Sequence, residues 1–240
     1  MNVAKKTVLI TGANRGIGRA LVDEALRRGA TRVYAGTRST MQHPDDRVVP
    51  LILDVTNAAQ IQEALQQVDN LDILINNAGV AIYDDLTNLN VIEQHLAVNF
   101  LGILRVTEAF MPKLKQSKGA ILNNLSMVGL APLPVVPAYS ASKAAAFSMT
   151  QSLRAILARD AVTVHAVVLG PVDTDMNRGF NIPKASAETA AAGIFNGLEN
   201  GEEEIFPDPA SQSIAEGWHN SVAKALERQF AAFVPASVAF

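Results

Sequence analysis

The segment that most constrains this chain lies near its start, where Thr11 to Gly18 read TGANRGIG. The pattern predicts a short apolar strand, Thr7 to Ile10, before it and an amphipathic helix, Ile17 to Arg28, after it. Glycines at such a junction let the backbone turn tightly and let the helix pack closely on the strand. The first N–H groups of that helix are free to bind a phosphate. The spacing is G-x-x-x-G-x-G, so this segment alone supports nucleotide binding and an ordinary turn equally.

Strand and helix patterns alternate along the rest of the chain. We expect further strands at 32–36, 48–53, 73–75, 120–125, 162–169 and 204–206, and further helices at 57–68, 91–114, 140–158, 186–198 and 214–230. Strands that are apolar on both faces and alternate with helices indicate a parallel sheet covered on both sides. We therefore predict an α/β fold: a single doubly wound Rossmann-type domain over residues 1–240, with a parallel seven-stranded sheet and helices on both faces.

Composition excludes several classes of protein. The net charge of −3 and the absence of any basic run argue against a nucleic-acid partner. No apolar run is long enough to span a membrane, and the start of the chain does not resemble a secretory signal, so we expect a cytoplasmic protein. Cysteine is absent, which leaves no disulfide and no thiolate metal site. The histidines lack the spacing of a metal site, so we expect no metal; they are His43, His95, His165 and His219.

A tyrosine and a lysine stand four residues apart near the start of the helix predicted at 140–158. This spacing places Tyr139 and Lys143 on one helix face. A nearby cation and a helix N-terminus both favour an ionised phenol, which would lower the pKa of Tyr139 and make it a usable acid–base group. Ser126 follows the strand at 120–125, where its hydroxyl can bind a substrate oxygen. Taken singly, these residues are better explained as an ordinary half-exposed pair on a helix and an ordinary loop or capping serine.

The combination of motifs is specific. The glycine segment, Asn76-Asn77-Ala78-Gly79, Asn99, Ser126, and Tyr139 with Lys143 closely resemble, in order and spacing, the single-domain short-chain dehydrogenase/reductases. The resemblance covers essentially the whole chain. It implies that Tyr139 is the general acid/base and that Lys143 lowers its pKa and holds the nicotinamide ribose. It also implies that Ser126 orients the substrate carbonyl and that Asn99 holds a water linking Lys143 to solvent.

Three of these positions also have plain structural interpretations. Asn99 in the middle of an apolar helix needs a polar partner, which a structural hydrogen bond would supply. Asn76 to Gly79 also reads as an ordinary turn with Gly79 at positive φ, whereas the resemblance makes it a wall of the cofactor site. Asp54 resembles the family residue that reaches the adenine, and it also suits the start of the helix at 57–68. The full set of expected cofactor residues is Gly12, Asn14, Arg15, Gly16, Ile17, Gly18, Arg38, Asp54, Val55, Asn77, Ala78, Gly79, Tyr139, Lys143, Gly170, Val172 and Thr174.

The residues after the second strand predict NADP(H) as the cofactor. A carboxylate at that place usually binds the ribose 2′-hydroxyl of NAD, but the strand here ends in Gly36-Thr37-Arg38. Arg38 and Arg15 would pair with a 2′-phosphate instead, because the guanidinium fork suits a phosphate. Without the adjacent glycine segment, two solvated surface arginines would be the better interpretation.

One position departs from the family pattern. A Pro-Gly pair usually follows the sixth strand and shapes the floor of the nicotinamide pocket, whereas Leu169 stands here where proline is expected. Leucine restores an N–H donor and backbone freedom that proline lacks. Gly170, Val172 and Thr174 still match, so we expect cofactor binding there, with an altered loop rigidity and substrate profile.

Two segments are expected to wall the substrate pocket. Residues 127–138 carry no charge, and a lid of about 175–198 adds apolar residues together with Arg178 and Lys184. Such a wall binds apolar groups and disfavours an unpaired carboxylate or phosphate, so we expect an uncharged, largely apolar carbonyl substrate. The expected substrate contacts are Met127, Val128, Leu133, Met176 and Phe180.

The sequence therefore predicts NADPH-dependent, reversible reduction of a ketone or aldehyde, with the proton from Tyr139. A regulatory or sensor protein that binds NAD(P) without turnover is one alternative. An epimerase or dehydratase with the same Tyr and Lys is another, but such enzymes usually carry a larger C-terminal domain than the roughly 65 residues after Thr174. The helices at 91–114 and 140–158 are apolar around much of their circumference, so we expect them to pair in a homodimer or homotetramer.

Overall fold

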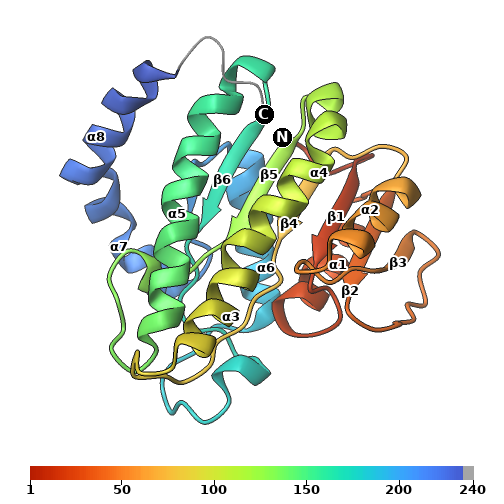
Figure 1. Ribbon diagram of the computed structural model, residues 1–240. Coiled ribbons are helices and arrows are strands. Elements are labelled where there is room, and N and C mark those ends of the chain that lie inside the picture. The colour runs from red at the N-terminus through yellow and green to blue at the C-terminus, as the bar shows by residue number, and fades with distance from the viewer. Residues whose placement is uncertain (235–240) are drawn as a thin grey trace.

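Seven parallel strands form one twisted sheet in the computed structural model, which describes residues 1–234 (Figure 1). Across the sheet the strands follow the order β3-β2-β1-β4-β5-β6-β7. They are β1 (Thr7–Thr11), β2 (Arg32–Thr37), β3 (Val48–Ile52), β4 (Ile73–Asn76), β5 (Ala120–Asn124), β6 (Thr163–Val167) and β7 (Glu204–Ile205). The predicted doubly wound, seven-stranded parallel sheet is confirmed. The order reverses between β1 and β4, and open α/β sheets bind ligands outside the carboxyl ends of the strands at such a point.

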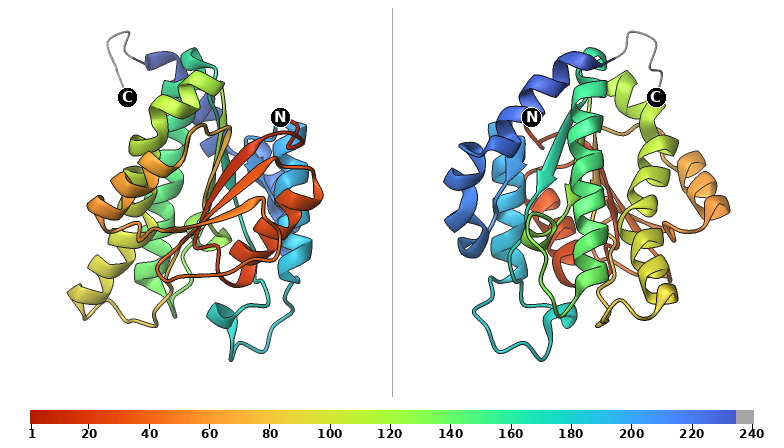
Figure 2. Two further views of the ribbon diagram at one scale, coloured as in Figure 1. Left: turned by 90° about the vertical axis from the view of Figure 1, so that its right-hand side faces the viewer. Right: turned by 60° about the vertical axis from the view of Figure 1, so that its left-hand side comes forward.

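Helices cover both faces of the sheet (Figure 2, left). On one face lie α1 (Gly16–Arg27) and α6 (Ala187–Asn200), and on the other lie α2 (Ala58–Gln67), α4 (Leu101–Ser117) and α5 (Pro137–Leu157). The remaining helices are α3 (Leu89–Asn99), α7 (Pro209–His219) and α8 (Val222–Phe230), with short 3₁₀ turns at Met127–Gly129, Ala158–Asp160, Asp175–Asn177 and Ala231–Phe233. None of the helices within residues 1–234 is long and apolar enough to span a membrane.

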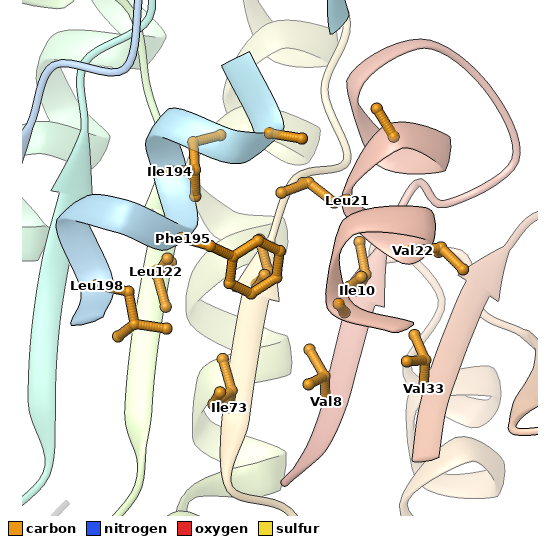
Figure 3. Packing of buried hydrophobic residues seen from close by; sticks show 14 of the residues in the cluster. Val8, Ile10, Leu21, Val22, Val33, Ile73, Leu122, Ile194, Phe195 and Leu198 are labelled. Atoms are coloured by element: carbon orange, nitrogen blue, oxygen red, sulfur yellow. The ribbon is translucent and has the colours of Figure 1, made fainter. Parts of the chain in front are cut away.

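The central strands are mostly apolar because both of their faces are buried. In β1, Val8 and Ile10 belong to the core under α1 and α6, whereas Leu9 belongs to the core under α2, α4 and α5. Phe195 of α6 packs in the first of these cores with Leu122 of β5 (Figure 3). Side chains alternate between faces along a strand, so only a strand buried on both sides needs an apolar residue at every position.

Two of the predicted helices are each divided in the structure. The prediction of one helix at 91–114 is wrong, because α3 ends at Asn99 and α4 begins at Leu101, with Phe100 between them at φ −117° and ψ −66°. The Asn99 side chain is bonded to other segments at this break, as described below. The prediction of one helix at 214–230 is also wrong: α7 ends at His219, and the Ser221 side chain accepts the Lys224 N–H to cap a new helix, α8.

The segment predicted as a lid begins as a loop and ends as a core helix. A backbone bridge between Val172 and Ala185 closes the base of this loop. From Ala187 the chain forms α6, which packs on α1 through buried residues such as Ile194 and Phe195. Only the part of the predicted lid before α6 is therefore a loop, and Figure 1 shows it projecting below the sheet in teal.

Candidate active site

The glycine segment brings the N-terminus of α1 to the carboxyl edge of the sheet. Gly12 and Gly16 have φ values of +67° and +52°, which favour glycine, and a Cβ on Gly18 would collide with the carbonyl oxygen of Gly12. The residue preceding α1, Arg15, makes no side-chain cap. The first N–H groups of α1 are thus available, and their donor set fits an anion such as a dinucleotide pyrophosphate.

The turn after β4 packs directly on the glycine segment. The Asn77 amide nitrogen donates to the carbonyl oxygens of Thr11 (2.9 Å) and Gly12 (3.2 Å). The Thr11 hydroxyl accepts the backbone N–H groups of Asn77 and Ala78, each at 3.0 Å. Gly79 is not at positive φ, so that expectation is wrong; a Cβ there would lie 3.3 Å from Asn99 Oδ1 and 3.8 Å from Lys143 Nζ. Glycine at this position lets the backbone approach both side chains closely.

The segment after β6 lies on the other side of the glycine segment. A Cβ on Gly16 would be 3.1 Å from Thr174 Cγ2, and Arg15 forms an ion pair with Asp175 at 3.2 Å. Leu169, in place of the family proline, is buried, and its carbonyl accepts the Met127 N–H at 2.9 Å. The predicted residues Gly170, Val172 and Thr174 therefore join the glycine segment at one edge.

Asp208 holds this segment, and sequence reasoning missed it. Its carboxylate accepts the Gly170 N–H at 2.8 Å and also forms a capping box with Ser211 at the start of α7. The pattern Asp208-Pro209-Ala210-Ser211, a cap followed by proline at the first helical position, is the signal that would have indicated it.

Ser126, Tyr139 and Lys143 come together as predicted from their spacing. Ser126 precedes the turn Met127–Gly129, and its side chain hydrogen-bonds that of Tyr139 in the first turn of α5. One helical turn later, Lys143 Nζ lies 5.7 Å from the centroid of the Tyr139 ring and donates to the carbonyl of Asn124 at 2.7 Å. The three side chains thus combine a hydroxyl, a phenol and an ammonium group in one place.

Burial sets the pKa values of this group. Burial raises the pKa of the Tyr139 phenol to about 12, although the hydrogen bond with Ser126 acts in the opposite direction. Burial also lowers the pKa of Lys143 to about 8. The expected fall in the pKa of Tyr139 is therefore wrong for this structure, because desolvation of the phenolate outweighs the hydrogen bond with Ser126. Tyr139 holds its proton at neutral pH.

Asn124 connects Lys143 to the glycine segment, and sequence reasoning missed it as well. Besides accepting from Lys143 through its carbonyl, it donates from its side chain to Asn77 Oδ1 at 2.8 Å. A continuous chain of hydrogen bonds therefore runs from Gly12 through Asn77 and Asn124 to Lys143. The Asn124 Oδ1 is buried without a hydrogen-bond partner, so the site retains one open acceptor.

Asn99 lies at the end of α3 and not in the middle of a helix. Its amide nitrogen donates to the Val80 carbonyl at 2.9 Å and to Ser142 Oγ at 3.0 Å, while Oδ1 accepts the Val80 N–H at 2.9 Å. These bonds give Asn99 the structural role considered in the sequence analysis; the water-holding role stays a prediction.

His95, four residues before Asn99 on the same face of α3, supports the catalytic tyrosine candidate. Its ring lies edge-on to Tyr139 with 6.1 Å between centroids. Nε2 accepts the Ile82 N–H at 3.0 Å, so Nδ1 carries the proton toward the Val91 carbonyl at 2.8 Å. The sequence signal was the i, i+4 spacing of two polar residues in an apolar helix.

The predicted adenosine-side residues lie around the ends of β2 and β3. Burial alone would raise the pKa of Asp54, but hydrogen bonds from Thr56 and the charge of Arg38 lower it overall. Thr56 donates to Asp54 through its hydroxyl at 2.7 Å and its N–H at 2.8 Å. Val55 is buried where a Cβ on Gly102 would touch it, so it packs on the first turn of α4.

The residues predicted to contact substrate are more scattered than Ser126, Tyr139 and Lys143. Met127 packs against the core cluster that contains Phe147, while Leu133 and Met176 are exposed. Val128 is half-buried in the turn after Ser126, and Phe180 stacks on Tyr83 in another loop. Their contact with substrate stays a prediction.

Comparisons with known proteins agree with this arrangement. The family model described as short chain dehydrogenase matches residues 6–184. The 11-beta-hydroxysteroid dehydrogenase-like 3 of Arabidopsis thaliana is 33% identical over 84% of this chain and 72% of its own length. The 3-oxoacyl-[acyl-carrier-protein] reductase FabG of Thermotoga maritima is 33% identical over 85% of this chain and 89% of its own length. The crystal structure of a short chain dehydrogenase from Burkholderia cenocepacia in complex with NADP is 35% identical, covers 98% of this chain and 100% of that one, and superposes with a TM-score of 0.87.

Proposed function

The chain belongs to the short-chain dehydrogenase/reductase family, and from this premise we propose that it is an NADPH-dependent oxidoreductase that reversibly reduces a ketone or aldehyde to an alcohol. The observation that carries the proposal is the grouping of Ser126, Tyr139 and Lys143, with Lys143 tied to Asn124. A protein that only sensed the nucleotide would need the glycine segment but not these three side chains together.

Tyr139 acts as the acid in the direction of reduction. Its raised pKa keeps the phenol protonated at neutral pH, so it can donate a proton to the carbonyl oxygen as negative charge develops there. The Ser126 hydroxyl, already bonded to the phenol, orients the same oxygen. The nicotinamide supplies the hydride when it is bound. The ammonium group of Lys143, 5.7 Å from the ring, stabilises the phenolate that remains after the proton has left.

The cofactor site fits NADP(H) better than NAD(H). The N-terminus of α1 would hold the pyrophosphate, and the turn Asn77 to Gly79 would wall the nicotinamide end. Arg38 follows β2 where an acid would otherwise bind a ribose 2′-hydroxyl, and it is exposed. Arg15 would have to leave Asp175 to take part. The Burkholderia short chain dehydrogenase, which was solved with NADP, supports this choice.

The substrate we propose is an uncharged, apolar carbonyl compound. The names of the Arabidopsis and Thermotoga relatives refer to a hydroxysteroid, which carries an alcohol, and to a 3-oxoacyl group, which carries a ketone. The uncharged segment 127–138 supports the same class here, and the loop before α6 would be its lid. We further propose a cytoplasmic homodimer or homotetramer that pairs through α4 and α5.

The test is the decrease in NADPH absorbance when purified protein meets a panel of aryl and alkyl ketones, aldehydes and ketoesters. We expect turnover of several members, and much less with NADH. Tight NADPH binding without oxidation by any member of the panel would favour the sensor alternative. Conversion of a substrate without net oxidation of NADPH would favour an epimerase or dehydratase.

A further inference from the structure

Two aromatic side chains from different loops stack on each other at the edge of the sheet where Tyr139 lies. Tyr83 belongs to the loop after β4 and Phe180 to the loop between β6 and α6. Their ring centroids are 5.7 Å apart and the rings are inclined by 24°. We propose that this pair, the aromatic bridge, selects carbonyl substrates that carry an aryl group beside the carbonyl. The inference rests on the proposed reductase function and adds a substrate class to it.

The backbone on both sides of Tyr83 is anchored next to Tyr139. Before it, the Ile82 N–H donates to Nε2 of His95, whose ring packs edge-on to Tyr139. After it, both carboxylate oxygens of Asp84 accept the N–H of Ala138, each at 3.3 Å, and Ala138 directly precedes Tyr139 in α5. The backbone position of Tyr83 relative to Tyr139 is therefore fixed, although the residue is 64% exposed.

Phe180 is held much less firmly. The base of its loop is closed by the bonds Asp173 N–H to Ala185 carbonyl (2.8 Å) and Ala185 N–H to Pro171 carbonyl (3.0 Å). At the tip, Gly179 has a φ of +97°, and a Cβ added to it would find no atom within 4 Å. This part of the loop has room to move on a fixed base. Phe180 can leave Tyr83 and return, whereas Tyr83 stays in place.

The geometry of the closed bridge determines what can replace it. A third ring between two stacked rings needs about 7 Å between their planes, more than this pair provides. A substrate therefore enters when Phe180 moves away, which uncovers one face of Tyr83. A flat aryl group can stack on that face and restore the lost ring contact, whereas a saturated group of similar size restores only the buried area. The bridge thus favours aryl ketones over their saturated analogues.

The experiment compares acetophenone with cyclohexyl methyl ketone, which differ only in whether the ring is aromatic. Binding is measured by calorimetry with NADP⁺-saturated protein and with protein alone, so no hydride is present and neither ketone reacts. We expect Tyr83→Leu to lower the ratio of the acetophenone affinity to the cyclohexyl methyl ketone affinity about two- to tenfold, the range that ring stacking supports. Phe180→Leu should tighten the binding of both ketones and leave this ratio unchanged, because it removes the contact that either ketone must break and keeps the face of Tyr83. The double variant should show the lowered ratio of Tyr83→Leu.

Three control variants separate the bridge from general effects on the loops. Tyr83→Phe keeps the ring and should bind like the wild type. Leu86→Ala and Asn181→Ala change exposed residues of the same two loops and should leave the ratio of the two affinities unchanged. An unchanged affinity ratio in Tyr83→Leu, or a lowered ratio in Phe180→Leu, would overturn the proposal.

Turnover of acetophenone with NADPH by the wild-type protein tests the reductase function separately. An aryl preference in binding that Tyr83→Leu removes, found without any turnover, would refute the reductase and keep the bridge. Turnover with an aryl preference that neither variant changes would keep the reductase and refute the bridge.

Discussion

On the proposed cofactor side of Tyr139, side chains of the glycine segment and of the turn after β4 bond to each other's backbone groups, whereas on the substrate side the loop after β6 meets its neighbours through contacts between side chains. Asn77 binds two carbonyl oxygens of the glycine segment, and Thr11 binds two N–H groups of the turn. Across the site, Arg15 with Asp175 and Tyr83 with Phe180 make the contacts. These side chains are largely exposed to solvent, unlike the bonded backbone of the cofactor side.

This difference indicates which kind of ligand each side is suited to bind. Backbone groups in a fixed turn present the same donors whatever the substrate, so the cofactor side suits a constant ligand. Side-chain contacts on a loop can change with few consequences for the fold, so the substrate side suits a variable one. We therefore expect substitutions to have large effects at the catalytic group and the cofactor side, and small effects on the loop.

The largest effect on turnover is expected for Tyr139→Phe. This change removes the transferable proton and leaves the cofactor side and the substrate side of the site intact. Turnover should fall about 10²- to 10⁴-fold, the usual contribution of general acid–base catalysis. Steady-state rates and NADPH titration by fluorescence measure the two quantities. NADPH affinity should stay close to the wild-type value, and near-normal turnover would contradict the proposed mechanism.

A methyl group on Gly18 should disrupt the cofactor side. The new Cβ collides with the Gly12 carbonyl, so Gly18→Ala must shift α1 away from the turn, at a cost of about 1–3 kcal/mol of unfolding free energy. NADPH affinity should fall about tenfold or more, since 1.4 kcal/mol corresponds to a factor of ten.

Gly217→Ala is the matched control, because Gly217 lies in α7 with nothing within 4 Å of an added Cβ. That change should stabilise the protein by about 0.5–1 kcal/mol, as alanine does in a helix, and leave NADPH binding unchanged. Denaturant unfolding together with NADPH titration tests both variants, and equal behaviour of the two would show that the packing at Gly18 is not required.

The buried side chain of Lys143 makes the free energy of unfolding depend on pH. Its folded-state pKa of about 8 lies below the ordinary value of 10.5, so between these values the unfolded chain binds more protons and stability rises with pH. Below pH 8 the buried ammonium group destabilises the fold. Lys143→Met should therefore be more stable than the wild type at pH 7, by about 2 kcal/mol after the loss of the bond to Asn124.

This advantage of Lys143→Met should shrink by pH 10.5, where the lysine is neutral in both states. Thermal unfolding across that range measures it. An advantage that is constant with pH would show that packing and not charge separates the two proteins. Turnover of the variant should be low throughout, because its phenolate has no cation beside it.

Cofactor choice is a smaller and more local effect. Arg38→Ala should lower the ratio of kcat/KM for NADPH over NADH about tenfold, as one charge-assisted contact to a phosphate is lost. Arg15→Ala should change this ratio less, because Arg15 is paired with Asp175 and its side chain is 67% exposed. A larger change in this ratio for Arg15→Ala than for Arg38→Ala would place the 2′-phosphate at the glycine segment instead of at the end of β2.

The sequence predicted features that depend on local spacing. The seven strands follow from short apolar runs, the junction before α1 from its glycines, and the placement of Tyr139 and Lys143 on one helix face from the period of 3.6 residues. Asn124, His95 and Asp208 were missed because their bonds join segments distant in the chain. Local spacing carries no record of such partners.

The pKa of Tyr139 was predicted in the wrong direction for a related reason. The lysine and the helix start are visible in the sequence, whereas the burial that raises the pKa of Tyr139 arises only when α5 meets the rest of the fold. The break at Phe100 was missed likewise, because Asn99 bonds Val80 and Ser142 on other segments.

The smallest effect is expected for Arg178→Ala on the loop, and it sharpens the comparison most. A keto acid and its ester differ by one charge, and Arg178 is the exposed cation of the loop closest in sequence to Phe180. Its side chain is 81% exposed and already paired with Asp175, so solvent and that carboxylate screen its charge. The ratio of kcat/KM for ester over acid should thus change less than about threefold, the scale of a surface ion pair.

Kinetics with the two substrates measure this ratio, and Asp175→Asn serves as the partner control, since it frees Arg178 and should move the ratio toward the acid. A wild-type preference for the acid that Arg178→Ala abolishes would mean that the loop cation, and not the uncharged wall at 127–138, selects the substrate.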